Sequence, residues 1–254
     1  MTQANGRASA AGGEKSRAVR ELKRLARPAG EFNAQRYFRG PVDLAFYNVG
    51  TQSTRALART IHAAHRDDWS LADAVAFADA MMVDRYLETK TVGIELLARY
   101  RRQFTPRLLD TFKRWLSSGC SSNWATTDAI SAYLIGPLLV EHPERADTMR
   151  SWSTHRNLWV RRASIVSLIP SIRKGVALDL AYDIANRLHA DAADLIQKAV
   201  GWALRECGRV DERRLERYLR AHGPRIPRTT LRYAIERFSK ARRLALMRAT
   251  RHGS

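Results

Sequence analysis

The sequence predicts an all-α protein, and three observations support that fold class. Apolar residues recur at helical spacing along almost the whole 254-residue chain, and the alternation typical of strands is nearly absent. Proline and glycine signals divide the chain into helices of about 10–18 residues. Successive pairs of about 35–40 residues fit a curved stack of degenerate helical repeats, an α-α superhelix. No strict sequence period appears, so a compact bundle stays open as the alternative.

The predicted helices have recognisable starts and stops. The first covers 18–26, where apolar residues recur every three positions until Pro28 ends the pattern. Ser70 is the expected N-cap of helix 71–82, and Gly208 is expected to stop helix 192–206. The other predicted helices cover 51–65, 84–101, 123–140, 143–152, 158–169, 176–188, 211–221 and 229–249, the last with a break near Ser239, and a further helix starts at Thr105-Pro106.

The composition predicts one domain behind a short tail. Residues 1–17 are small, polar and basic and show no apolar periodicity, which is typical of a disordered basic tail. Residues 18–254 are expected to form a single domain, because a chain of this length can bury a substantial core.

The charge of the chain points to a polyanionic partner. The sequence has 44 Lys and Arg against 25 Asp and Glu, a formal charge of +19. Concentrated on one face, such a charge would bind nucleic acid. No apolar run is long enough for a membrane span, so membrane binding is not expected. Two cysteines are too few for a disulfide framework. The seven histidines show no metal-ligand spacing, so we expect no metal.

Three segments combine indole, carboxylate and guanidinium groups at helical spacing. They are Asn-Trp-Ala-Thr-Thr-Asp at 123–128, Asn-Leu-Trp-Val-Arg-Arg-Ala at 157–163 and Ile-Gln-Lys-Ala-Val-Gly-Trp-Ala-Leu-Arg-Glu at 196–206. In the first, Trp124 and Asp128 are four residues apart and so share one helix face. Each feature taken alone is most often core packing, a helix cap or a solvated charge.

In this order and spacing, together with His142-Pro143-Glu144, the three motifs resemble the AlkD family of DNA alkylation repair glycosylases. The resemblance covers roughly residues 34–237, and the chain departs from the family pattern at Asn123 and Ala125. It implies HEAT-like helical repeats with a concave basic face for double-stranded DNA. We also expect a monomer that uses no cofactor, and the low cysteine content favours a reduced setting in the cytoplasm, at the nucleoid.

The resemblance assigns roles to particular residues. It places the catalytic carboxylate at Asp128 and the lesion-facing indoles at Trp124 and Trp202. It places a DNA-contacting arginine at Arg162 and an active-site tyrosine at Tyr37. We also expect DNA contacts at Arg161, Tyr37, Lys198 and Arg205. The implied reaction is hydrolysis of the N-glycosidic bond of 3- and 7-alkylpurines, bulky adducts included, by a monofunctional glycosylase.

These residue types suit that chemistry. A purine alkylated on a ring nitrogen is cationic, so its glycosidic bond is weakened and the sugar develops positive charge as the base departs. A nearby carboxylate stabilises that charge and orients the attacking water. Indole faces attract a cationic base by about 0.5–2 kcal/mol per contact.

Two other functions stay open from the sequence. A non-catalytic helical-repeat protein could bind DNA or act as a scaffold, and it would have no need of Asp128. A protein–protein adaptor on the same fold would require a less basic groove.

Overall fold

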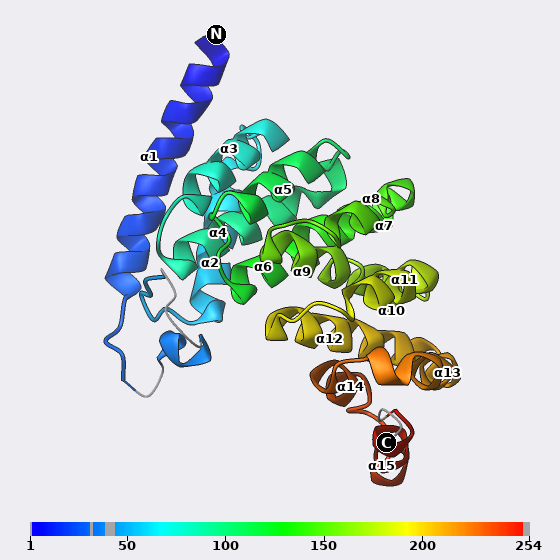
Figure 1. Ribbon diagram of the computed structural model, residues 1–254. Coiled ribbons are helices and arrows are strands. Elements are labelled where there is room, and N and C mark those ends of the chain that lie inside the picture. Colours follow the sequence, from blue (N-terminus) through cyan, green and yellow to red (C-terminus); the bar gives the residue numbers. More distant parts are fainter. Residues whose placement is uncertain (1, 31–32, 39–43, 251–254) are drawn as a thin grey trace. The chain divides into compact units, whose positions relative to one another are not determined.

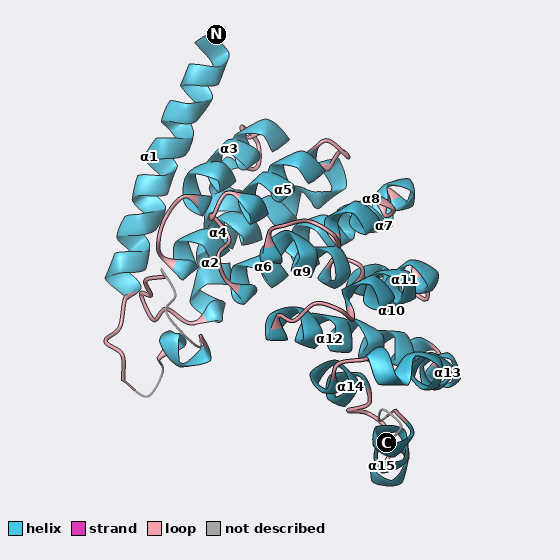
Figure 2. Cartoon of the chain, in the orientation of Figure 1, coloured by secondary structure: helices cyan, strands magenta, loops and turns pink. Residues whose placement is uncertain are grey.

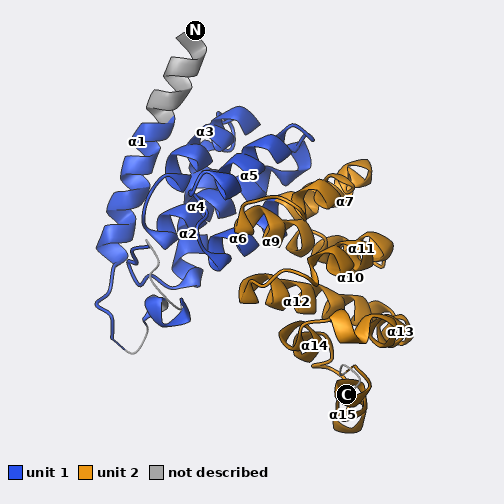
Figure 3. Ribbon diagram, viewed as in Figure 1, with its two compact units in different colours: residues 1–134 blue, residues 135–254 orange. Residues whose placement is uncertain are grey.

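The computed structural model describes residues 2–30, 33–38 and 44–250, and the fold there is helical (Figures 1 and 2). Within these ranges the only β-type pairing is an isolated bridge between Ala45 and Tyr86. The all-α prediction is therefore confirmed. The chain divides into two compact units, residues 1–134 and 135–254 (Figure 3). The single domain expected over 18–254 stays a prediction.

The first unit is a set of helices packed around α4. Helix α4 packs against α1, α2, α3 and α6, and α1 also packs against α3. The elements of this unit are α1 (Thr2–Leu25), η1 (Ala34–Tyr37), α2 (Thr51–His65), α3 (Leu71–Met82), α4 (Leu87–Leu97), η2 (Ala98–Gln103), α5 (Leu108–Ser117) and α6 (Trp124–Ile130). Ser70 caps α3 as expected, and Asp73 completes a reciprocal capping box with it.

Helix α1 is much longer than the sequence predicts. It runs from Thr2 to Leu25 and so includes most of the segment expected to be a tail. Ala11, Ala18 and Leu22 are buried at intervals of seven and four residues, which places them on one face. Alanine supplies two of these three positions, and an apolar pattern made of alanines is hard to distinguish from a flexible, small-residue segment.

The second unit continues the pairing of helices. Its elements are α7 (Gly136–Glu141), η4 (Pro143–Arg145), α8 (Thr148–Trp152), α9 (Leu158–Val166), α10 (Ile169–Arg173), α11 (Leu178–Leu188), α12 (Asp194–Val210), α13 (Glu212–His222), η5 (Gly223–Arg225), α14 (Arg228–Ala234) and α15 (Lys240–Ala249). A π-helical turn, η3 (Ser131–Ile135), joins α6 to α7. The break expected near Ser239 is confirmed, because Ser239 caps α15.

The stop predicted at Gly208 is wrong. Helix α12 continues through Gly208 to Val210, and the extended backbone of Asp211 ends it. Asp211 then caps α13, where its carboxylate accepts a hydrogen bond from Arg214 N at 2.8 Å. A Cβ atom on Gly208 would lie 2.5 Å from Cδ2 of Leu215. The glycine therefore permits close approach of α13 rather than termination of α12.

Helix α12 is the centre of the second unit and lies beside α14 (Figure 1). It packs against α9, α10, α11, α13 and α14. At Gly201 the approach is closest, because a Cβ there would lie 2.7 Å from the carbonyl oxygen of Thr230 and would also overlap Tyr233. One turn earlier, Thr230 Oγ1 donates a hydrogen bond to Gln197 O at 2.9 Å. These contacts fix α12 against α14 at the position of Trp202.

We expect Gly201→Ala to lower the free energy of unfolding by about 1–3 kcal/mol, because the added methyl group meets backbone that must move. Gly208→Ala is the matched control in the same helix, since its methyl group meets only the tip of a leucine side chain. Chemical denaturation of both variants measures the difference. Equal stability of the two would contradict a constrained α12–α14 contact.

Candidate functional site

Helix α6 is held at its start by a buried cap. Asn123, one of the two departures from the family pattern, is 2 % exposed, and its side-chain oxygen accepts a hydrogen bond from Thr126 N at 2.8 Å. Its amide also donates to Thr126 Oγ1 at 3.0 Å. The cap satisfies a backbone N–H that the first helical turn leaves without an intrahelical partner. The first turn of α6, which begins at Trp124, is therefore fixed in orientation.

The two faces of α6 differ in burial. Thr127 is buried, and its hydroxyl lies 2.9 Å from that of Ser121, while Ser131 donates to Thr127 O at 2.8 Å. Trp124 and Asp128, which lie one turn apart, are only partly buried. The backbone then enters the π-helical turn η3, a rare conformation that is frequent at functional sites.

An aromatic stack covers one side of Trp124. The ring of Phe38 lies 5.4 Å from the indole of Trp124 at an interplanar angle of 26°, and 5.4 Å from the ring of Phe46. Tyr37, the residue expected at the site, is 65 % exposed. The neighbouring Phe38 makes the described contact with Trp124. A function of Tyr37 at the site stays a prediction, and the sequence reasoning did not identify Phe38.

A buried carboxylate holds the segment that carries Phe46. Glu88 at the start of α4 is 5 % exposed, and it accepts hydrogen bonds from Tyr47 N at 3.1 Å and Val49 N at 3.3 Å. Burial raises the pKa of Glu88, although the surrounding backbone N–H groups act in the opposite direction. The ring of Tyr47 also stacks on Tyr86, with centroids 3.9 Å apart. Sequence reasoning missed Glu88, because an acid near a helix start normally reads as a solvated charge.

The two adjacent arginines of α9 bind within the second unit. Arg161 Nε donates to Asp191 Oδ2 at 2.7 Å, and its Nη1 donates to the carbonyl oxygens of His155 and Arg156. Arg162 is only 6 % exposed and donates to the carbonyl oxygen of Leu195 in α12. Both guanidinium groups therefore bind α9 to the segment that leads into α12 and to its first turn. Their contact with DNA stays a prediction.

Helix α12 presents a stripe of polar side chains around Trp202. Lys198 lies one turn before Trp202 and Arg205 nearly one turn after it, so the three share a face. Trp202 is partly buried. Lys198 Nζ lies 2.6 Å from Asp194 Oδ2, and Arg205 pairs with Glu236. The acidic partners Asp194 and Glu236 are each about 60 % exposed, so these pairs are weak and exchangeable.

The predicted site residues thus form one set in each unit. The first unit holds Tyr37, Trp124 and Asp128. The second holds Arg161, Arg162, Lys198, Trp202 and Arg205. The first set offers a carboxylate beside an indole, which can stabilise a developing cation. The second offers an indole among cations, which can bind a phosphate chain and stack on a base.

Metal and thiol chemistry have little support in the described residues. No group of three or more His, Cys, Asp or Glu side chains among them could hold a metal ion. Cys207 is buried, and burial raises the pKa of its thiol to about 12, so it is not a ready nucleophile. No helix in the described part of the chain is long and apolar enough to cross a membrane.

Comparison with known proteins gives one family and one fold. The sequence model of the DNA alkylation repair enzyme family matches residues 18–238. A solved structure of a predicted DNA alkylation repair enzyme from Enterococcus faecalis superimposes with a TM-score of 0.70 at 18% sequence identity. That likeness covers 78% of this chain and 90% of the other. A search of curated protein sequences finds no match.

We expect Glu88→Ala to destabilise the first unit by about 2–4 kcal/mol, because it leaves two buried backbone N–H groups without acceptors. Glu95→Ala is the control on the same helix, since it removes a pair with the exposed Arg55 worth at most about 1 kcal/mol. Chemical denaturation measures both, and limited proteolysis should cut 44–50 faster in Glu88→Ala. Similar behaviour of the two variants would mean that Glu88 does not hold the segment.

Proposed function

Because the chain belongs to the family of DNA alkylation repair enzymes, we propose that it is a DNA glycosylase that hydrolyses the N-glycosidic bond of cationic N-alkylated purines in duplex DNA. One observation carries the proposal within the family. Asp128 lies on the partly buried face of a capped helix, one turn from the indole of Trp124. A protein that only bound DNA would have no use for a carboxylate there, since its charge repels phosphate.

The reaction is proposed to take place at the sugar. The bond between C1′ and N9 of the purine breaks, and its electron pair neutralises the positive charge that alkylation at N3 or N7 placed on the base. A water oxygen forms the new bond to C1′, and Asp128 accepts the proton that this water loses. The carboxylate also stabilises the positive charge that develops on the sugar before the water has bonded. The products are a neutral free base and an abasic site.

The indoles are proposed to hold the damaged nucleotide. Trp124 has one side against Phe38, which limits its motion and leaves the remaining indole surface for the lesion. Trp202 would contribute the second aromatic surface from α12. A cationic base is attracted to such faces more strongly than a neutral one, by about 0.5–2 kcal/mol per contact. This preference would separate alkylated from undamaged purines before any chemistry takes place.

The cations of α12 are proposed to hold the strand. Lys198 and Arg205 can exchange their carboxylate partners, Asp194 and Glu236, for phosphate oxygens, because surface ion pairs contribute little free energy. A phosphate accepts bidentate hydrogen bonds from the Arg205 guanidinium. Arg161, Arg162 and Tyr37 complete the proposed DNA-contact set. Contact through sugar and phosphate would also tolerate bulky adducts on the base.

The enzyme is proposed to be monofunctional and to act as a monomer on chromosomal DNA in the cytoplasm. Strand cleavage would require a neutral amine to attack the sugar and form a Schiff base. The candidate amine is Lys198, one turn before Trp202. A phosphate contact is the better use for such a lysine.

We expect Asp128→Asn to release 3-methyladenine and 7-methylguanine from methylated duplex DNA at least 100-fold more slowly than the wild type, because the amide cannot stabilise the sugar cation or accept a proton. Chromatography of the free bases measures the rate. Asp110→Asn, which removes an exposed carboxylate on α5, is the matched control and should keep the wild-type rate.

Equal rates for wild type and Asp128→Asn would remove Asp128 from the reaction. If the wild type binds the methylated duplex but releases no base, the protein is a helical-repeat DNA-binding protein rather than a glycosylase.

A further inference from the structure

The polar stripe of α12 extends one turn beyond the predicted site residues. Arg209 follows Trp202 by seven residues, so it lies on the face that already carries Lys198, Trp202 and Arg205. Seven residues correspond to about 10 Å along a helix axis. Arg209 is exposed, and its Nη1 lies 3.0 Å from Glu206 Oε2. The sequence analysis assigned it no function.

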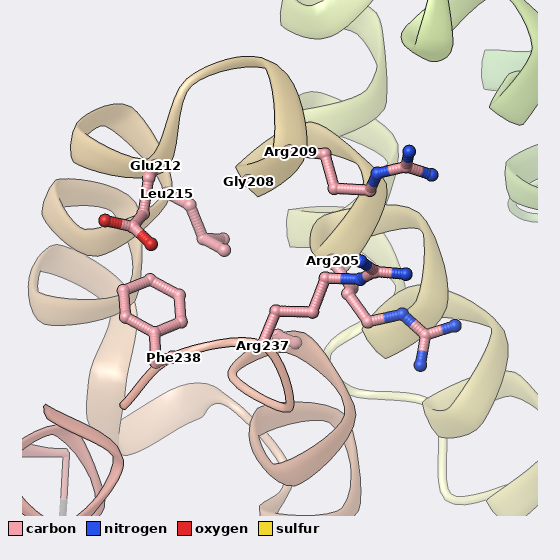
Figure 4. Close-up of a pocket in the computed structure, with 8 residues that line it drawn as sticks. Arg205, Gly208, Arg209, Glu212, Leu215, Arg237 and Phe238 are labelled. Carbon is pink, nitrogen blue, oxygen red and sulfur yellow. The ribbon is translucent and has the colours of Figure 1, made fainter. Parts of the chain in front are cut away.

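At this end of the stripe the surface forms an open pocket of about 310 Å³. Figure 4 shows the guanidinium groups of Arg205, Arg209 and Arg237 extending toward one side of the view, with Glu212 and Phe238 on the other. The pocket is lined by Arg205, Gly208, Arg209, Glu212, Leu215, Ala234, Arg237 and Phe238. Three cations thus share a pocket with one carboxylate.

The single acid of the pocket is already engaged. Glu212 pairs with Arg242, and the guanidinium of Arg242 lies over the ring of Phe238 at 4.5 Å. Arg237 is exposed and forms no ion pair with any described side chain. The Nε of Arg205 is buried and has no hydrogen-bond partner in the described part of the chain. The pocket therefore has more hydrogen-bond donors and positive charge than its own residues satisfy.

The arrangement also holds its cations in place. The carboxylate of Glu206 is 3 % exposed and binds both Arg173 at 2.9 Å and Arg209 at 3.0 Å. Because a guanidinium has five N–H donors, Arg209 keeps donors for a ligand while it stays anchored. The apolar wall of Leu215, Ala234 and Phe238 reduces competition from water, which strengthens the attraction of the cations for an anion.

We propose that this pocket is a second phosphate site, in which Arg209 and Arg237 bind a backbone phosphodiester of duplex DNA beside the phosphate proposed for Arg205. With α12 taken to run along the duplex, about 10 Å of helix matches three steps of 3.4 Å and places the site about three base pairs from the nucleotide at Trp202. This assignment of distance rests on the proposed function, in which Trp202 faces the lesion. The occupancy of the pocket by a DNA phosphate does not.

The first test measures the salt dependence of binding to a short undamaged duplex. Arg237→Gln and Arg209→Gln should each weaken binding several-fold and reduce the slope of log affinity against log salt by up to about 0.9, the value for one complete phosphate contact. Arg217→Gln, an exposed arginine of α13 outside the pocket, is the matched control. An unchanged slope in both pocket variants, or the same loss in Arg217→Gln, would overturn the proposal.

The second test locates the phosphate. A duplex with a stable abasic-site analogue fixes the register, and a neutral methylphosphonate linkage replaces one phosphate at a time. Wild-type affinity should fall when the replaced phosphate lies about three base pairs from the analogue, and Arg237→Gln should lose less affinity there because part of the contact is already missing. Equal sensitivity of both proteins at every position would overturn the assigned distance.

The sources of phosphate are separated by competition. Inorganic phosphate, added at constant ionic strength, should displace the duplex from the wild type no better than sulfate does, because the site is proposed for a phosphodiester held by neighbouring contacts. Selective displacement by inorganic phosphate would assign the pocket to a free ion instead. Base release from methylated duplex is measured in parallel. If the pocket variants keep the wild-type salt slope while the wild type releases bases, this site alone is overturned. If the variants change the slope but the wild type releases no base, the proposed reaction alone is overturned.

Discussion

Helix α12 has to meet two opposite demands, and the organisation of the second unit follows from them. One face carries Ile196, Ala199, Val200, Ala203, Leu204 and Cys207, all buried against neighbouring helices. The other carries an indole and three cations that must remain near water. The helix can satisfy both only if its rotation about its own axis is fixed. The contact between Gly201 and the backbone of Thr230 fixes it, and this contact excludes any side chain at position 201 larger than hydrogen.

The first unit solves a similar problem by hydrogen bonding rather than close packing. The proposed reaction requires α6 to hold Asp128 in one orientation, and the buried Asn123 cap fixes the first turn of α6. Glu88 ties the segment bearing Phe46 to α4, and Phe46 and Phe38 then support the indole of Trp124. The buried Glu88 and the proposed catalytic carboxylate of Asp128 thus lie in the same unit. Glu88 is 5 % exposed, whereas Asp128 has an intermediate exposure that suits its proposed function.

The sequence predicted those helix boundaries that depend only on neighbouring residues. Ser70 and Ser239 cap helices because a hydroxyl at a helix start bonds the free backbone N–H groups, and that needs no tertiary information. The helix end predicted at Gly208 was wrong because the sequence alone does not distinguish a glycine that ends a helix from one that permits close packing of a neighbouring helix. Only the position of Leu215 distinguishes them.

The motifs predicted that Trp124 and Asp128 share a helix face, but they could not predict which residues distant in the sequence support that helix. Phe38 and Glu88 act through residues 86 and 39 to 41 positions away in the sequence, respectively. The arginines show the same limit. The sequence shows an excess of positive charge but not where each arginine binds. The structure shows that Arg161 binds Asp191, that Arg162 donates to the backbone of α12, and that Arg237 lines a pocket beside α12.

Hydrolysis at the sugar is tested most directly by the state of the DNA strand after one turnover. A duplex with a single 7-methylguanine is incubated with excess protein, and one half of the sample is then treated with alkali before denaturing electrophoresis. A monofunctional glycosylase leaves an intact strand that breaks at the lesion only after alkali. An intact strand in both halves would contradict base release, and a broken strand without alkali would contradict the hydrolytic mechanism.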